Sequence, residues 1–493
     1  MSLIQVEHLT FAYPGSYDNV FEDVSFQIDT DWKLGLLGRN GRGKTTFLRL
    51  LQSKYPYEGR ISQPGLCAYF PPPVPDAGAM TLEVLCGLCP AAEEWELLRE
   101  TGLLGVDAEA LYRPFDTLSN GERAKCLLAA LFCGEDRYLL IDEPTNHLDA
   151  AGRRAVASYL RGKRGFLLVS HDRDFLDGCV DHILALNRTG VEVRNGNFSS
   201  WWENKERRDA FERAENEKLR GEIKRLEQSA EERKRKADAV ERAKTGISSQ
   251  GIVKHGLRPY LGEKSRKGQQ QRKNMDHRVE RAITEKSGLL KDLEKTEILK
   301  LHPLTARGRL WDLREVCLFY GEKRVCGPLT FRIEPGERLV VHGGNGSGKS
   351  TLLKLLCGQD ICYTGTLTQL SGMTVSYVPQ DTSHLRGSLR DYARESGVDE
   401  TLLLAILRKL DFPRAQFEKD MADWSAAQKK KALIARSLCE SAGLYIWDEP
   451  LNYLDVWSRM QVEELLLKFQ PTMVFVEHDG AFRRKAATRV VEL

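Results

Sequence analysis

Short apolar runs followed by helical patterns occur twice, once early and once late in the chain. Residues 33–37 precede a glycine-rich segment, and an amphipathic pattern at residues 47–51 follows it. Residues 338–341 and 352–356 repeat this order. Apolar runs of strand length that alternate with helical patterns predict a mainly parallel sheet. We therefore expect two α/β regions.

An internal repeat links these regions. Three separate pairs of matching residues recur at offsets of 305, 306 and 307 positions, and these pairs are Lys44/Lys349, Asp142/Asp448 and His171/His478. A nearly constant offset across separate motifs is the mark of a duplicated unit. The sequence predicts two copies of one domain.

The segment between the copies has a different composition. Residues 203–242 mix Glu with Lys and Arg and contain no proline, and residues 269–300 are similar. Both stretches predict charged helices, and the glycines around residues 244–262 predict a turn between them. Together these elements predict a helical hairpin, and a solvated linker is the alternative interpretation. The expected division is 1–202, 203–303 and 304–493, with a basic tip at about 243–268.

Bulk composition sets limits on the class of protein. The net charge is only +3, and no run approaches the ~20 apolar residues that span a bilayer. The N-terminus does not resemble a secretory signal. Eleven scattered cysteines, of which Cys86 and Cys89 form one unmatched CxxC pair, favour a reducing compartment. We expect a cytoplasmic, bacterial protein without a membrane partner.

The two glycine-rich segments have the spacing Gly-x-x-x-x-Gly-Lys-Thr/Ser. After a strand and before a helix, this pattern predicts a phosphate-binding loop whose backbone N–H groups face an anion. Lys44 and Lys349 should contact phosphate, and the hydroxyls of Thr45 and Ser350 should bind Mg²⁺. The predicted ATP-binding residues of the loops are Gly38, Arg39, Asn40, Gly41, Arg42, Gly43, Lys44, Thr45 and Thr46, and then Gly343, Gly344, Asn345, Gly346, Ser347, Gly348, Lys349, Ser350 and Thr351.

An Asp-Glu pair ends an apolar run in each copy. Asp142 and Asp448 are expected to serve the metal, because a strand end delivers a carboxylate towards it. Glu143 and Glu449 follow directly and should polarise water for attack. His171 and His478 also follow apolar runs, at positions where they could face the terminal phosphate. These four residues are the predicted catalytic set.

Together these residues resemble the ABC ATPase superfamily. The resemblance implies that Asp149 and Asp455 are D-loop residues and that Tyr13 and Tyr320 stack on adenine. It makes Gln380 a Q-loop residue that contacts ATP and metal. The two signature motifs it implies comprise Ser119, Asn120, Gly121 and Glu122 in the first copy, and Ser425 and Ala427 in the second.

Two departures from the family pattern fall together. Pro72 stands where the first copy should carry the Q-loop glutamine, and Ala426 and Ala427 replace signature glycines. In ABC dimers each ATP lies between the phosphate-binding loop (the Walker A motif) of one domain and the signature motif of the other domain. Both departures therefore belong to the site that holds Lys44, whereas the site that holds Lys349 is complete.

The two copies on one chain and the long charged spacer resemble the ABC-F class, and the segment 32–46 is similar to its Lsa-type antibiotic-resistance branch. The resemblance implies ribosome binding at the exit-tRNA site, next to 23S rRNA and peptidyl-tRNA, and protection from lincosamides, streptogramins A and pleuromutilins. It also implies a monomer with paired domains and no DNA partner. The basic tip could contact RNA by itself, and its candidate residues are Lys254, Leu257, Arg258, Tyr260, Leu261 and Lys264.

Other functions remain open at this level. The chain could be an ABC-F translation factor without a resistance role. It could be a tandem ATPase subunit of a membrane importer, although a ~100-residue basic-tipped spacer is hard to explain there. A mechanical or DNA-repair ABC protein would carry its coiled coil or zinc module inside a domain, and that pattern is missing from this sequence.

Overall fold

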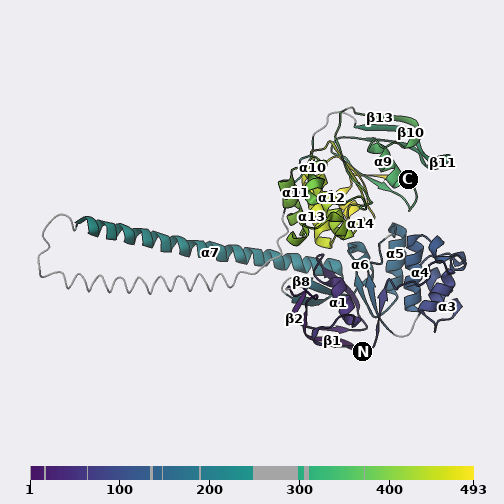
Figure 1. Ribbon diagram of the computed structural model, residues 1–493, viewed down its shortest axis with the longest axis horizontal. Helices are drawn as coiled ribbons and strands as arrows, with labels where there is room; N and C mark the ends of the chain where they lie inside the picture. Colours follow the sequence, from purple (N-terminus) through teal and green to yellow (C-terminus); the bar gives the residue numbers. More distant parts are fainter. Residues whose placement is uncertain are drawn as a thin grey trace. The chain divides into compact units, whose positions relative to one another are not determined.

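The computed structural model describes residues 2–15, 18–63, 65–133, 137–146, 148–187, 190–247, 298–304, 310–370 and 372–493. The chain forms two compact units. The first comprises Met1–Trp201 together with Thr296–Leu493, and the second comprises Trp202–Lys295. The first unit contains two α/β halves with the same architecture (Figure 1).

A six-stranded sheet forms the centre of the first half, in the order β5-β6-β7-β3-β8-β9. All neighbouring strands are parallel except β8 and β9. The expected mainly parallel sheet is confirmed. The strands are β3 (Lys33–Gly38), β5 (Cys67–Phe70), β6 (Tyr138–Asp142), β7 (Phe166–Val169), β8 (His182–Asn187) and β9 (Gly190–Asn195).

A smaller antiparallel sheet adjoins this core, and helices complete the half. Its order is β2-β1-β4, and its strands are β1 (Leu3–Phe11), β2 (Phe21–Asp29) and β4 (Glu58–Ser62). The helices are α1 (Lys44–Leu51), α2 (Thr81–Leu88), α3 (Glu94–Leu103), α4 (Asn120–Phe132), α5 (Ala150–Arg161) and α6 (Arg173–Cys179). One buried cluster, which includes Phe47 and Leu140, joins α1 to both sheets.

The second half repeats the plan. Its parallel sheet has the order β14-β15-β16-β12-β17, and its antiparallel sheet the order β11-β10-β13. The strands are β10 (Trp311–Tyr320), β11 (Lys323–Ile333), β12 (Arg338–His342), β13 (Cys362–Gln369), β14 (Val375–Val378), β15 (Leu444–Asp448), β16 (Met473–Val476) and β17 (Arg489–Glu492). The helices are α9 (Lys349–Leu356), α10 (Leu389–Glu395), α11 (Glu400–Lys409), α12 (Ala426–Cys439), α13 (Val456–Phe469) and α14 (Gly480–Ala486).

The predicted charged helix is present as α7 (Phe198–Ile247), which has 50 residues and starts five positions before the expected one. Charge pairs one turn apart support it, such as Lys205–Asp209 and Glu231–Arg235. Its mean hydropathy is low, and no helix within the described ranges is both long and apolar enough to cross a membrane.

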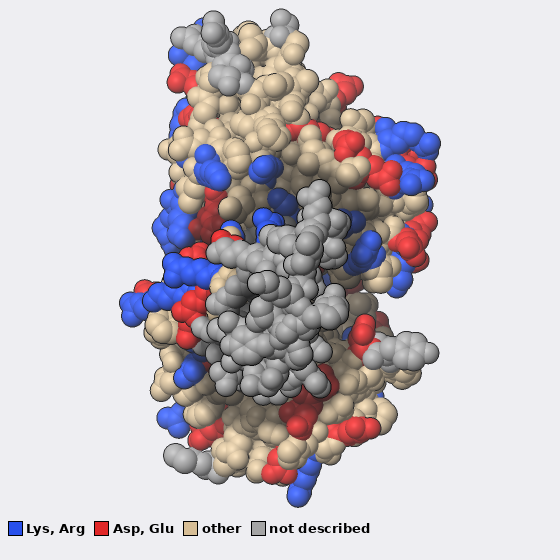
Figure 2. Space-filling view, turned by 90° about the vertical axis from the view of Figure 1, so that its left-hand side faces the viewer, with Lys and Arg blue, Asp and Glu red and all other residues tan. Residues whose placement is uncertain are grey.

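The second linker helix predicted before residue 298 lies outside the described residues. The predicted tip contacts, Lys254, Leu257, Arg258, Tyr260, Leu261 and Lys264, also lie outside them. On the described surface seen in Figure 2, basic and acidic side chains lie side by side. This distribution fits the net charge of +3.

Candidate functional site

Each phosphate loop connects a central strand to a helix that begins at the loop lysine. Gly43 and Gly348 precede α1 and α9 with φ of 86° and 92°. A Cβ on Gly43 would lie 2.5 Å from Val20 Cγ1, and one on Gly348 would lie 2.9 Å from Val325 Cγ1. Both the backbone conformation and the space therefore require glycine. Since glycine has no side chain to cap a helix, the first N–H groups of each helix are left for an anion.

The two loop lysines are buried and fold back over their own loops. Lys44 Nζ donates to Gly38 O at 2.6 Å, and Lys349 Nζ donates to Gly343 O at 3.0 Å and Gly344 O at 2.7 Å. Burial lowers the pKa of both ammonium groups. A buried ammonium at a helix N-terminus is a strong site for phosphate oxygens.

The hydroxyl and carboxylate predicted to hold a metal meet in both halves. Thr45 Oγ1 donates to Asp142 Oδ2 at 3.3 Å, and Tyr69 Oη donates to the same oxygen at 2.9 Å. In the second half the Ser350 hydroxyl favours the charged form of the Asp448 carboxyl and so acts to lower its pKa. Asp448 Oδ1 is buried without a hydrogen-bond partner among the described atoms. Burial raises the pKa of both aspartates. These oxygen donors fit Mg²⁺, which prefers hard ligands.

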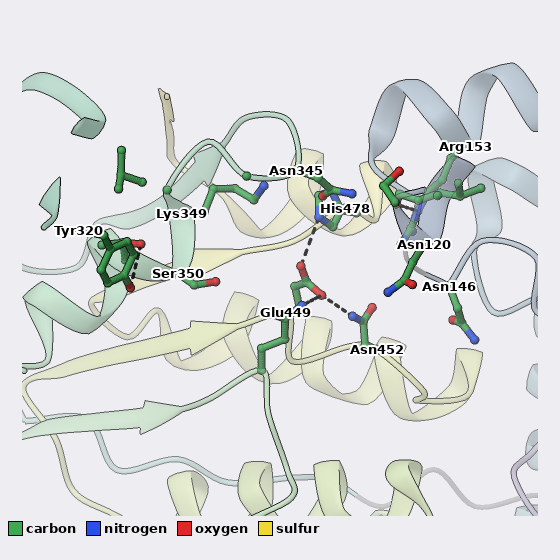
Figure 3. A pocket seen from close by; sticks show the side chains of 18 of the residues that line it. Asn120, Asn146, Arg153, Tyr320, Asn345, Lys349, Ser350, Glu449, Asn452 and His478 are labelled. Carbon is green, nitrogen blue, oxygen red and sulfur yellow. Dashed lines mark hydrogen bonds and ion pairs between the residues drawn. The ribbon is translucent and has the colours of Figure 1, made fainter. Parts of the chain in front are cut away.

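Glu449 has three side-chain partners. Gln380 Nε2 donates to Glu449 Oε2 at 2.8 Å, and Asn452 Nδ2 donates to the same atom at 2.5 Å. His478 Nε2 lies 3.4 Å from Glu449 Oε1 (Figure 3). Burial favours a raised pKa, but the hydrogen bonds from His478 and Gln380 outweigh it and lower the pKa of Glu449 to about 2. Gln380, which the sequence also assigned to the metal, thus contacts the carboxylate predicted to polarise water.

Glu143 has a different environment. Its Oε1 lies 3.3 Å from His171 Nε2. Burial, followed by the negative charge of Asp142, raises the pKa of Glu143 to about 7. Both predicted catalytic glutamates follow their strand with positive φ, 50° at Glu143 and 45° at Glu449. Positive φ is uncommon outside glycine, and such strained backbone positions often occur in active sites.

A cavity of about 660 Å³ lies between the halves of the first unit and has the size of a ligand site. Lys349, Ser350 and Tyr320 line one side, and Asn120 and Asn146 line the other (Figure 3). Further lining residues include Ser119, Gly121, Arg153, Asn345, Gly346, Gly348, Thr351, Gln380, Glu449, Asn452 and His478. The cavity brings together the second loop and the first signature, as the resemblance implied.

The signature residues begin helices in both halves. Ser119 caps α4 in a reciprocal capping box with Glu122, and Ser425 caps α12 with Gln428. Asn120 and Gly121 form the first turn of α4, so the cavity has helix N-termini on both sides, those of α9 and α4. An anion between them would gain from both dipoles.

Contacts also bring the first loop to the second half. Asn40 N donates to Asp455 Oδ2 at 3.3 Å, and Asn40 Nδ2 donates to Tyr453 O at 3.1 Å. Asp455 caps α13, and its counterpart Asp149 caps α5. The predicted D-loop residue of one half thus contacts the phosphate loop of the other. Arg39 adds an ion pair with Asp411 at 2.9 Å.

The two predicted adenine-stacking residues are accessible. Tyr320 is 54% exposed and lines the cavity. Tyr13 is 36% exposed, and its hydroxyl lies 2.7 Å from Thr46 Oγ1. Pro72, at the missing glutamine position, is half-buried and offers no side-chain donor.

Sequence reasoning did not single out several residues of these sites. Asn146, Arg153, Asn452 and Tyr453 line the cavity, and Tyr69 donates to Asp142. Asn146 and Asn452 are separated by 306 positions, the offset of the aspartate pair. This repeat could have identified both asparagines.

Comparisons with known proteins agree with this arrangement. The ABC transporter family model matches residues 21–67 and 326–452, one segment in each half. The chain is 28% identical to the ribosome protection protein VmlR of Bacillus subtilis over 96% of this chain and 84% of that protein. It is 27% identical to the ATP-binding protein Uup of Caulobacter vibrioides over 96% of this chain and 74% of that one.

Solved structures support the fold. The archaeal ribosome recycling factor aABCE1, in complex with stalk protein aP1, matches with a TM-score of 0.61 at 19% identity, over 96% of this chain and 84% of that one. A structure of RNase-L inhibitor matches with a TM-score of 0.60 at 20% identity, over 99% and 87%. These structures support the fold alone. The matches of the ABC transporter family model in both halves indicate two tandem ABC ATPase domains, and these matches together with the ATP-binding relatives support ATP hydrolysis by the chain.

Proposed function

We propose that this ATPase is an ABC-F protein of the Lsa-type branch. It binds the bacterial ribosome in the cytoplasm at the exit-tRNA site and protects translation from lincosamide, streptogramin A and pleuromutilin antibiotics. The 28% identity to a ribosome protection protein across almost the whole chain supports this proposal. The boundaries near residues 202 and 303 would place the charged linker between two ATPase domains.

The residues of each site divide the work of hydrolysis. Lys44 and Lys349 would hold phosphate oxygens of ATP, and the loop N–H groups would stabilise the charge that develops there. Thr45 with Asp142, and Ser350 with Asp448, would hold Mg²⁺, which when bound neutralises phosphate charge. Glu143 and Glu449 would orient water and accept its proton, with His171 and His478 holding each carboxylate.

The cavity between the second phosphate loop and the N-terminus of α4 carries the mechanism. ATP bound there would contact both domains, whereas ADP lacks the phosphate that reaches the opposite helix. A ligand shifts a conformational equilibrium only through its different affinity for the two states. ATP should therefore favour the paired, ribosome-binding state, and hydrolysis should release the protein.

Ribosome co-sedimentation tests this function. The Glu143→Gln/Glu449→Gln double variant should pellet with ribosomes when ATP is present and remain in the supernatant with ADP. A matched Lys44→Ala/Lys349→Ala variant, which should not hold ATP, is the control and should not pellet in either state. Sedimentation that ignores the nucleotide would refute the proposal, and co-purification with a membrane permease would favour the importer alternative.

The resistance role has a separate test at the predicted tip. Its basic residues, such as Lys254, Arg258 and Lys264, would contact rRNA phosphates. Leu257, Tyr260 and Leu261 would reach unpaired bases, and stacking is worth about 1–3 kcal/mol per base. Tyr260→Ala should lower antibiotic protection in cell-free translation about tenfold while ATPase activity persists. Full protection after residues 251–262 are replaced by a short Gly/Ser turn would contradict a role for the tip.

A further inference from the structure

Helix α12 connects elements that belong to different ATP sites. Its N-cap is Ser425 of the second signature, which the resemblance to ABC dimers assigns to the site of Lys44. Along its length it contacts β14, and its side chains reach the end of β15. These strands lead to Gln380 and Glu449, which belong to the site of Lys349. One helix therefore touches parts of both sites.

Lys430 makes the most direct of these connections. Its side chain is 1% exposed, and its Nζ donates to Pro379 O and to Asp448 O, each at 2.9 Å. These two carbonyls belong to the peptide bonds that precede Gln380 and Glu449. Since Gln380 Nε2 also donates to Glu449, the contacts close a ring that starts and ends at Lys430. A shift of α12 would move both residues of this hydrogen-bonded pair.

A second, buried hydrogen-bond chain joins the same elements. Trp447 Nε1 in β15 donates to Ser437 Oγ in α12 at 2.9 Å, and Ser437 Oγ lies 2.7 Å from Ser376 Oγ in β14. The Ser376 hydroxyl donates to Glu440, so the Ser437 proton points to Ser376. Arg436 adds a bond to the carbonyl of Tyr377. Buried polar groups with satisfied partners hold neighbouring elements in one arrangement.

The first half lacks the side chains for such bonds. At an offset of 306, Ala124, Ala130 and Leu131 replace Lys430, Arg436 and Ser437. Ala68 takes the place of Ser376 by sheet register, because it pairs with Leu139 as Ser376 pairs with Tyr445. None of these side chains has a hydrogen-bonding atom. Ala68, Ala130 and Leu131 instead border a cavity of about 210 Å³. The contact between the signature helix and its neighbouring strands therefore contains buried hydrogen bonds in the second half, whereas in the first half it borders a cavity.

We propose that Lys430 is a positioning residue that couples the two ATP sites through α12. When ATP contacts Ser425 at the site of Lys44, the position of α12 is fixed, and Lys430 transmits that position to Gln380 and Glu449 at the other site. In the first half, the helix that follows the signature lacks these hydrogen bonds, so its position should affect the neighbouring ATP site less. This inference rests on the assignment of the ATP sites under Proposed function.

The coupling can be measured with a fluorescent, non-hydrolysable ATP analogue and Mg²⁺. Lys44→Ala and Lys349→Ala each disable one ATP site, so binding to each variant gives the association constant of the site that remains. The overall constant for double occupancy, divided by their product, is the coupling factor, and such factors are typically about 5 to 150. Lys430→Met should lower this factor at least about fivefold while each single-site constant changes less than about threefold.

Ala124→Met, at the matching position of the first half, is the control and should leave the coupling factor within about twofold of the parent. A Lys430→Met protein that is folded but keeps the parent factor would overturn the proposal, because a purely structural role predicts lower stability alone. If Lys430→Met does not fold, Ser376→Ala, which installs the first-half residue, must lower the factor, and an unchanged value overturns the proposal. If the Lys44→Ala protein still binds two molecules of the ATP analogue, the assignment of the ATP sites is wrong.

Discussion

The two glutamates that follow the paired aspartates occupy the same place in two copies of one fold, yet their surroundings differ. Glu449 accepts hydrogen bonds from Gln380 and Asn452 and contacts His478. Glu143 contacts His171, but the position that matches Gln380 is Pro72, which has no donor. A duplicated backbone therefore does not guarantee two equal reaction centres.

This difference concerns orientation. Two amide donors fix Glu449 Oε2, so its other oxygen has a defined direction towards His478. Accurate placement of a base relative to water supplies a large part of a hydrolytic rate. The site of Lys349 should therefore turn over ATP faster than the site of Lys44, although both should bind it.

The largest effect should follow from removing both carboxylates. Glu143→Gln/Glu449→Gln should lower steady-state ATPase activity by at least about 100-fold, since general-base catalysis typically contributes 10²–10⁴. ATP binding should persist because the loop lysines are unchanged. Phosphate release and equilibrium binding of labelled ATP measure the two quantities. Undiminished turnover would show that neither glutamate acts on water.

The single variants test the comparison itself. Glu449→Gln should lower the steady-state rate on the order of tenfold more than Glu143→Gln, because it disables the better oriented base. Single-turnover rates of both variants, measured beside the parent, separate chemistry from product release. Equal losses would mean that the sites contribute equally despite their different contacts.

The missing glutamine gives a smaller effect with a matched control. Gln380→Ala removes one hydrogen bond to a charged group, worth about 1.5 kcal/mol at the lower limit, and should lower kcat about tenfold. Pro72→Ala removes no side-chain donor and should leave kcat within about twofold of the parent. A comparable loss in both variants would place the asymmetry elsewhere.

The sequence predicted the repeated framework well. An apolar strand followed directly by a glycine-rich Lys motif or by an Asp-Glu pair can be recognised from consecutive residues alone. The strands before Gly38 and Asp142, and the helix that begins at Lys44, were all expected and are present. The charged helix was also expected, although its start at Phe198 was placed five residues late because aromatic residues there hide the charged pattern.

Contacts between distant residues could not be predicted from such patterns. Lys430 looks like one of three consecutive surface lysines after the signature, yet it is buried, and its Nζ donates to two backbone carbonyls from separate segments. Tyr69 also gives no sign of its role in the sequence, because it lies in an apolar strand. Its hydroxyl meets Asp142 only because Asp142 ends the neighbouring strand β6. These roles depend on the tertiary fold, which local periodicity does not encode.

The smallest expected effect concerns the alanines of the second signature. Ala426 and Ala427 form the first turn of α12, and their N–H groups would face phosphate at the site of Lys44. Glycine at both positions would let the backbone approach more closely, but it costs up to about 1 kcal/mol of helix stability per residue. The double change to glycine should therefore raise the ATPase rate of Glu449→Gln, whose turnover depends on this site, only about two- to threefold, with a slightly lower Tm. Using the Glu449→Gln background isolates the weaker site, and glycine at the same positions in Glu143→Gln should have no such effect. A rise of the same size in both backgrounds would show that the gain comes from domain closure in general, and the alanines would then not account for the difference between the sites.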